Sequence, residues 1–179
     1  MKHEPPKARL IYHGVSPWEI EVIYSYLHSR FKVIAEEIEA TSTDFASALH
    51  INIPVAFSEE FFEWFDFRRW ENVKALLKEM KRRRGRDNAI IVSIRFEGIP
   101  TVEFVLDATD RQWYNNALEK IDFVLELIPY HMETSAKYGN VSKMVYRFDE
   151  NKKRWRLVEV VTDSGEQHAI MDQHADRSL

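Results

Sequence analysis

The chain has no cysteine, and this absence narrows the chemistry that it can carry. Without cysteine there is no disulfide, no thiol nucleophile, no iron–sulfur cluster and no cysteine-based zinc site. Its five glycines form no glycine-rich phosphate loop, and the sequence has neither a GxSxG nor an HExxH motif. No apolar run is long enough for a transmembrane helix, and the first residues, MKHEPPKARLIYHG, lack the apolar run of a signal peptide. We therefore expect a cytoplasmic protein with no role in a membrane.

Apolar residues are abundant enough to build one hydrophobic core. They make up 45% of the 179 residues, and aromatic residues make up 13%. A domain of this length buries about 70% of the surface of its unfolded chain. The net charge of −4 argues against general affinity for nucleic acid, so such a role would need a local basic patch. We expect a single domain over residues 1–162 and a polar C-terminal tail over residues 163–179.

Three helices are predicted from N-capping residues and from apolar side chains that recur at helical spacing. The residues predicted to cap them are Ser16, in a capping box with Glu19, then Ser58, and then Thr109, in a capping box with Gln112. Asp66 is placed to interrupt the second helix. Pro129 is predicted to end the third helix, because proline lacks the N–H that a helix interior needs.

A hairpin is predicted after each helix. The stretches FKVIAEEIEA and ALHINIPVAF are predicted as two strands, although the first could instead continue the helix to about Ala40. Alternating apolar residues in NAIIVSIRFEGIPTVEFVLDATD predict a hairpin with a three-residue loop that sets Ile94 beside Val102. The last hairpin, KMVYRFDENKKRWRLVEVV, pairs Phe148 with Trp155. These recurring helix–hairpin units predict an α+β fold, an antiparallel sheet built from hairpins with about three helices packed on one face.

The stretch FFEWFDFRRW holds six aromatic residues in ten positions, which is more than one helix face can bury. Trp64 and Phe67 project away from the predicted core face. Exposed aromatic residues commonly mark an interface, although these side chains could instead pack against a second layer of the same chain. Stacking with unpaired bases is a third alternative, but the neighbouring acids would repel phosphates. The residues predicted to bind a partner are Phe61, Trp64, Phe67 and Trp70.

The stretch EMKRRRGRDN places five cations within six residues of an acidic chain. Cations are favoured at a helix C-terminus, where Gly85 is also suited to end the helix, so the cluster has a structural explanation. The alternative is phosphate binding, shared with the last hairpin, where two arginines are predicted to lie side by side. The residues predicted for this nucleic-acid alternative are Lys81, Arg82, Arg83, Arg84, Arg86, Arg147, Lys152, Lys153, Arg154 and Arg156.

One group of acids could bind a divalent metal ion. Glu103, Asp107 and Asp110 follow one another at the end of a predicted strand, and His131 lies downstream. Carboxylates at the end of a strand can hold a metal in hydrolases. However, acids are favoured at a helix entry in any case, and Glu103 is placed to pair with Arg95. We therefore predict no metal site, no cofactor and no catalytic residue.

The sequence favours a protein that acts by binding and not by catalysis. The predicted partner is a second copy of the chain, as a homodimer, or another protein. Nucleic-acid binding through residues 81–86 and 152–156 is the first alternative, and a metal-dependent hydrolase is the second. The biological process and the identity of the partner do not follow from the sequence.

Overall fold

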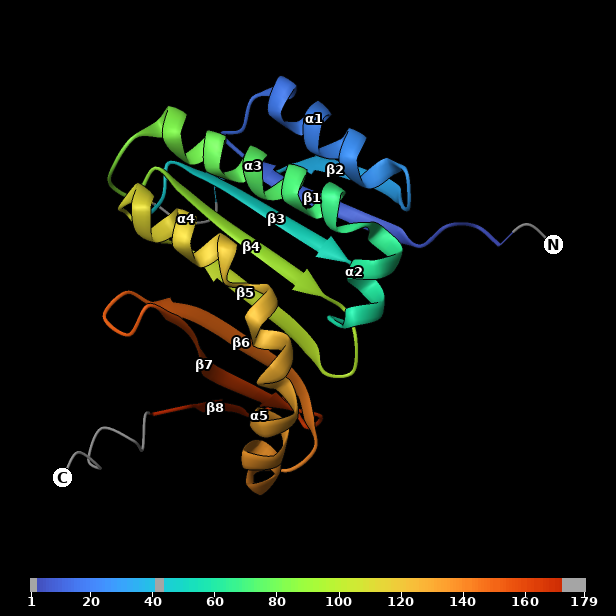
Figure 1. Ribbon diagram of the computed structural model, residues 1–179, viewed down its shortest axis with the longest axis vertical. Helices are drawn as coiled ribbons and strands as arrows, with labels where there is room; N and C mark the ends of the chain where they lie inside the picture. Colours follow the sequence, from blue (N-terminus) through green and yellow to red (C-terminus); the bar gives the residue numbers. More distant parts are fainter. Residues whose placement is uncertain (1–2, 41–43, 172–179) are drawn as a thin grey trace.

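The described residues form two layers, a sheet of eight strands and a layer of five α-helices (Figure 1). The computed structural model describes residues 3–40 and 44–171. The strands are β1 (Lys7–His13), β2 (Lys32–Glu37), β3 (Ser47–Ile53), β4 (Ile90–Phe96), β5 (Thr101–Leu106), β6 (Val141–Asp149), β7 (Arg154–Thr162) and β8 (Gln167–Ala169). The helices are α1 (Pro17–His28), α2 (Glu59–Phe65), α3 (Phe67–Arg84), α4 (Arg111–Glu119) and α5 (Ile128–Ser135), with the short 3₁₀ helices η1 (Asp122–Glu126) and η2 (Ala136–Tyr138). The predicted α+β class is confirmed.

The sheet is mixed, so the prediction of an antiparallel sheet is wrong. Its strand order is β2-β1-β3-β4-β5-β6-β7-β8. The pairs β1/β2, β3/β4 and β5/β6 are parallel, and the other neighbours are antiparallel. Each parallel pair is joined by a helical crossover, because parallel neighbours cannot be joined by a tight turn. Residues 32–37 form a strand as predicted, but β2 and β3 are not a hairpin, since β1 lies between them.

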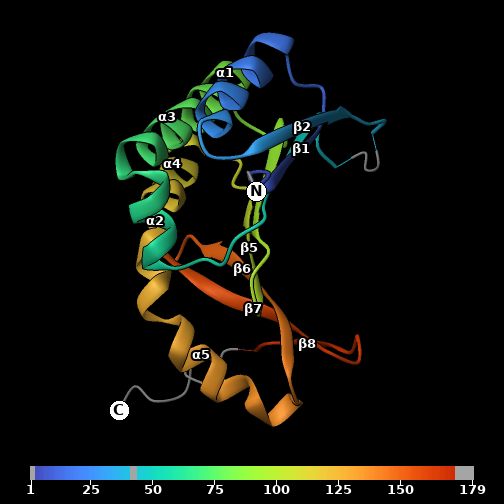
Figure 2. The same ribbon diagram turned by 90° about the vertical axis from the view of Figure 1, so that its right-hand side faces the viewer.

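All five helices pack on one face of the sheet (Figure 2). Alternate side chains of the central strands point into this layer, and Leu49, Val92, Phe104 and Tyr146 are fully buried there. Among the described residues no helix lies on the opposite face, which we call the bare face. In the same part of the chain, no helix combines the length and the apolar character that crossing a bilayer requires.

The helices number five and not about three because the second predicted helix is divided into α2 and α3, and because α5 follows the predicted third helix. Asp66 separates α2 from α3 as predicted, with a φ of 82° and a side chain that accepts a hydrogen bond from Arg68 N. The N-cap of α4 is Asp110 and not Thr109. The prediction that Pro129 ends a helix is also wrong. Proline is tolerated in the first turn, and Pro129 lies in the first turn of α5.

The second and third predicted hairpins are present, and the second has a different register from the one predicted. β4 and β5 pair Ile94 with Phe104, not with Val102, because residues 97–100 all belong to the loop and Glu97 N donates to Ile53 O at 2.8 Å. The predicted pairing of Phe148 with Trp155 in β6 and β7 is confirmed.

Part of the predicted tail belongs to the sheet. Gln167–Ala169 forms β8 against β7, and Ile170 N donates to Val158 O at 2.9 Å just beyond it. The sheet therefore extends past residue 162, where we predicted the domain to end. Residues 172–179 of that tail lie outside the described part of the chain.

Candidate functional site

The basic segment 81–86 ends α3 and is largely engaged within the fold. Lys81 is buried, and its Nζ lies 5.8 Å from the centre of the Tyr114 ring. Arg84 forms an ion pair with buried Glu19, with Nη1 2.7 Å from Oε2. Gly85 follows at a φ of 75° and ends the helix. These contacts give Lys81 and Arg84 a structural role.

The other cations of the segment lie at the surface. Arg82 and Arg83 both bind Glu79, and their hydrogen bonds lower the pKa of Glu79 to about 2. Arg86 is exposed. In Figure 1, α4 lies between the end of α3 and the hairpin of β6 and β7. The nucleic-acid function predicted for them stays a prediction.

The aromatic segment 61–70 is divided between the core and the surface. Phe61 and Trp70 are buried, so neither offers surface to a partner. Trp64 is 41% exposed and Phe67 is 53% exposed. Both rings are partly covered, because Trp64 packs edge-on against Phe31 and Phe67 stacks on Phe62. The partner-binding role of this segment therefore depends on Trp64 and Phe67 alone.

The possible metal ligands Asp107, Asp110 and His131 each have a separate structural role. Asp107 pairs with Arg147, Asp110 caps α4, and His131 Nδ1 lies 2.8 Å from Tyr146 Oη. Within residues 3–40 and 44–171, no group of three or more histidines and acids lies close enough to hold a metal ion.

Glu103 is the centre of an ion-pair cluster on the bare face. Its carboxylate lies 2.7 Å from Lys143 Nζ, and Ser93 Oγ donates to it at 2.8 Å. Burial alone would raise the pKa of Glu103, but the hydrogen bonds from Lys143 and Ser93 hold this pKa below its ordinary value. Glu103 therefore stays ionised, with its oxygens already engaged.

A hollow lies at the C-terminal end of the helix layer. It has a volume of about 490 Å³ and lies between α5 with η2 on one side and β7 with the segment after β8 on the other. We call it the C-terminal cleft. Trp155 and Leu157 of β7, Tyr138 of η2 and Ile170 are among its lining residues. The Tyr138 ring stacks on His168 with 4.5 Å between ring centres, which joins η2 to β8.

The residues that hold the cleft in shape are anchored to the core. Trp155 is buried, and its indole Nε1 donates to Ala117 O at 2.9 Å. His131 of α5 is held against the sheet by its contact with Tyr146. Burial lowers the pKa of His131, so this imidazole is neutral at neutral pH. The cleft is therefore built on fixed side chains.

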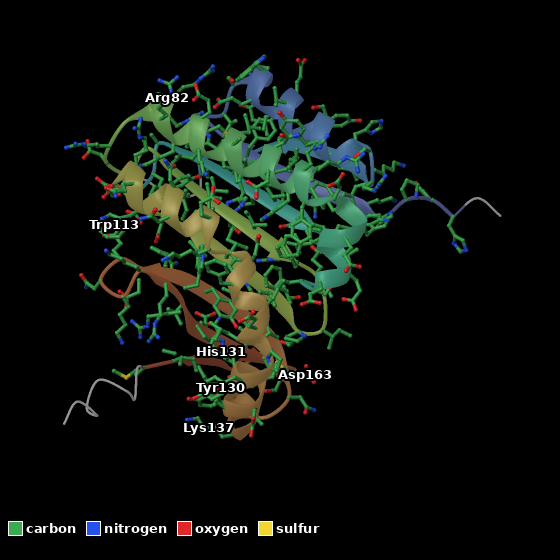
Figure 3. All side chains as sticks on the ribbon, in the orientation of Figure 1. Arg82, Trp113, Tyr130, His131, Lys137 and Asp163 are labelled. Carbon is green, nitrogen blue, oxygen red and sulfur yellow. The ribbon has the colours of Figure 1, made fainter. Side chains whose placement is uncertain are left out.

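Two exposed apolar side chains, Leu127 and Tyr130, line the cleft, and a third, Phe123, lines a smaller hollow beside it. Phe123, Leu127 and Tyr130 are 66%, 38% and 54% exposed and follow one another at spacings of four and three residues. We call this row the η1–α5 ridge. Figure 3 shows Tyr130 and His131 on α5 at the lower end of the molecule, far from Arg82. Single exposed apolar residues need no explanation, but a contiguous row beside a hollow is typical of an interaction site.

The charged residues that line the cleft are cations, and one of them, Arg156, is paired with Asp149. A second hollow of about 190 Å³ shares Leu127, Arg154 and Trp155 with it. The cations that line the two hollows are Lys120, Lys137, Lys153, Arg154 and Arg156. None of the lining residues that the structure describes is an aspartate or a glutamate. In a chain with a net charge of −4, this is a local concentration of positive charge.

Comparison with known protein families, with curated proteins and with solved structures gives no match. Of the residues predicted to bind nucleic acid, Lys153, Arg154 and Arg156 line the hollows, whereas Arg147 pairs with Asp107. The η1–α5 ridge was not predicted. Pro129 beside Leu127 was the available signal, since proline favours the first turn of a helix.

Proposed function

We propose that the protein acts by binding an acidic segment of a partner protein at the C-terminal cleft and the η1–α5 ridge. The observation that carries this proposal is the combination of three exposed apolar side chains with a hollow whose charged lining is cationic. Apolar and aromatic side chains supply binding energy at the centre of protein interfaces. The cations attract an oppositely charged partner and fix its orientation.

A macromolecular partner fits this surface better than a small ligand does. The cleft alone has the volume of a small-molecule site. However, Phe123 and Tyr130 are more than half exposed, so a molecule confined to the hollow would leave much of the ridge uncovered. A protein segment that spans the ridge and the cleft would bury both.

Selection from a random peptide display library tests the proposal. We expect the protein to enrich peptides that contain both acidic and large apolar residues. The variant K137Q/R154Q, which removes two of the cations, should no longer enrich acidic residues. R82Q/R83Q removes the same charge at the end of α3 and should select like the parent. Equal selection by all three proteins, or no selection, would contradict the proposal.

Nucleic acid is the second anionic partner to consider, since Tyr130, Tyr138 and the nearby cations could stack and hold unpaired bases. A fluorescent single-stranded RNA separates the two classes. Under our proposal the RNA binds more weakly than the selected peptides at the same salt concentration. RNA binding that is stronger than peptide binding, and that R82Q/R83Q abolishes, would favour the basic segment at the end of α3 instead.

Self-association through Trp64 and Phe67 is a second candidate function, favoured by the exposure of both rings. It predicts a homodimer in sedimentation velocity experiments, converted to monomer by W64S/F67S. The matched variant L127S/Y130S, at the ridge, should leave such a dimer intact. A parent protein that sediments as a monomer at high concentration would exclude this candidate.

A further inference from the structure

We propose that the acidic segment binds as an added β-strand along the edge that residues 154–157 of β7 form, a step that rests on the proposed function and specifies how the partner is held. Strand addition is a common way to bind an extended peptide. Main-chain hydrogen bonds supply affinity, and alternate side chains supply specificity.

Within residues 3–40 and 44–171, the first half of β7 has a strand neighbour on one side only. Residues 154–157 pair with β6, whereas β8 pairs with residues 159–161. Among the hydrogen bonds of the described residues, the one from Ile170 N to Val158 O is the last between β7 and the segment after β8. Residues 154–157 therefore present a sheet edge of about 13 Å to which, within the described part of the chain, no strand is paired.

This edge borders the C-terminal cleft. Arg154, Trp155, Arg156 and Leu157 all line it, opposite the residues of α5 and η2. An extended segment that enters the cleft therefore meets the main chain of β7 on one side and Tyr130 on the other. β2 forms the other outer edge of the sheet, and no residue of β2 lines either of the two hollows.

The two faces of β7 specify the sequence of the segment. Trp155 and Leu157 are buried and point to the helix layer. Arg154 and Arg156 alternate with them along β7, so their side chains point to the bare face. Arg156 also binds Asp149, with Nη1 3.2 Å from Oδ2. A strand added in line with the sheet follows the same alternation. Its apolar residues would meet Trp155, Leu157 and Tyr130, and its acidic residues would lie beside the arginines.

Synthetic eight-residue peptides test this inference, with binding measured by fluorescence anisotropy. We expect a peptide that alternates valine with glutamate to bind at least about tenfold more tightly than a peptide with four valines followed by four glutamates. The two peptides have equal charge and composition, so the order of residues alone distinguishes them. Only an extended strand needs the alternation.

Two N-methylated forms of the alternating peptide test the main-chain contacts. In a strand, the N–H groups of alternate residues point to the same edge. One peptide is methylated on all valine nitrogens and the other on all glutamate nitrogens. We expect one of these two peptides to bind at least about tenfold more weakly than the parent peptide and the other to bind like it. On the protein, amides in residues 154–157 should exchange more slowly with solvent when the peptide is bound, while those of β2 should not change.

Each of the following three results would overturn strand addition. If both methylated peptides bind like the parent peptide, the segment is held by its side chains only, and the proposed function stands without this inference. If the alternating and block peptides bind equally, the predicted pattern is wrong. If no peptide binds, strand addition is wrong, and the display selection decides separately whether the cleft receives any acidic partner.

Discussion

Replacement of Arg84 by methionine is expected to lower the free energy of unfolding by about 3 kcal/mol, because it leaves a buried carboxylate without its ion pair. Arg84 Nη1 lies 2.7 Å from Oε2 of Glu19, and Nη2 lies 2.8 Å from Oε1, so the contact is bidentate. Arg84 Nε also donates to Ser47 Oγ at 3.2 Å. The pair joins the end of α3 to the first turn of α1. Urea denaturation at neutral pH measures the loss.

Two further variants show whether the ion pair is responsible. R82M removes an exposed arginine that is paired with half-buried Glu79 at the surface, and it should leave stability unchanged within error. The double variant E19L/R84M removes both charges and should recover much of the stability lost in R84M, because no buried charge remains without a partner. If R84M were as stable as the parent, the structural explanation of the basic segment would be wrong.

The effect of R84M should depend on pH. Burial alone would raise the pKa of Glu19, but the hydrogen bonds from Arg84 and Ser16 hold this pKa below its ordinary value. A carboxyl group with a lowered folded-state pKa stabilises the fold above its unfolded-state pKa, and this contribution is lost as the pH falls through the folded-state value. The difference in stability between parent and R84M is therefore expected to shrink as the pH falls below about 4.

The variant L127S/Y130S is expected to weaken binding of a library-selected peptide by about 100-fold. Truncation of a hot-spot side chain at the centre of an interface costs about 2 kcal/mol or more, and this loss with a smaller one from the second side chain gives about 2.7 kcal/mol, which corresponds to this factor. Both side chains are more than one-third exposed, so their loss should not unfold the protein. Isothermal titration calorimetry measures the change.

The matched control for this prediction is W64S/F67S. It also removes two exposed large side chains, but from the junction of α2 and α3. We expect it to bind the selected peptide like the parent. If L127S/Y130S kept full affinity while W64S/F67S lost it, the binding surface would be the aromatic segment predicted from the sequence.

Capping residues and apolar spacing predicted most helices and strands. Contacts between residues far apart in the sequence could not be predicted in this way. The capping box of Ser16 and Glu19 is present, with Ser16 Oγ accepting from Glu19 N at 3.2 Å. Its sequence pattern did not show that the same carboxylate binds Arg84, which is 65 residues away. Phosphate binding by the cations at the end of α3 therefore remained an alternative to their role in ending the helix.

The candidate site was missed because one proline has two possible roles. Pro129 can end a helix or lie in the first turn of the next one, and local sequence does not distinguish the two. The structure has the second arrangement, which places Leu127 and Tyr130 beside the edge of β7. The prediction of β6 and β7 was accurate, but the cleft depends on where β8 ends, and β8 was predicted as tail.

The most direct test of the central claim is to map a selected acidic peptide onto the protein by two-dimensional NMR. We predict that the backbone signals that shift on titration come from residues 123–138 and 154–157, around the η1–α5 ridge and the C-terminal cleft. Signals from residues 64–67 and 81–86 should not move. Shifts centred on either of those segments, with none in the cleft, would contradict the account.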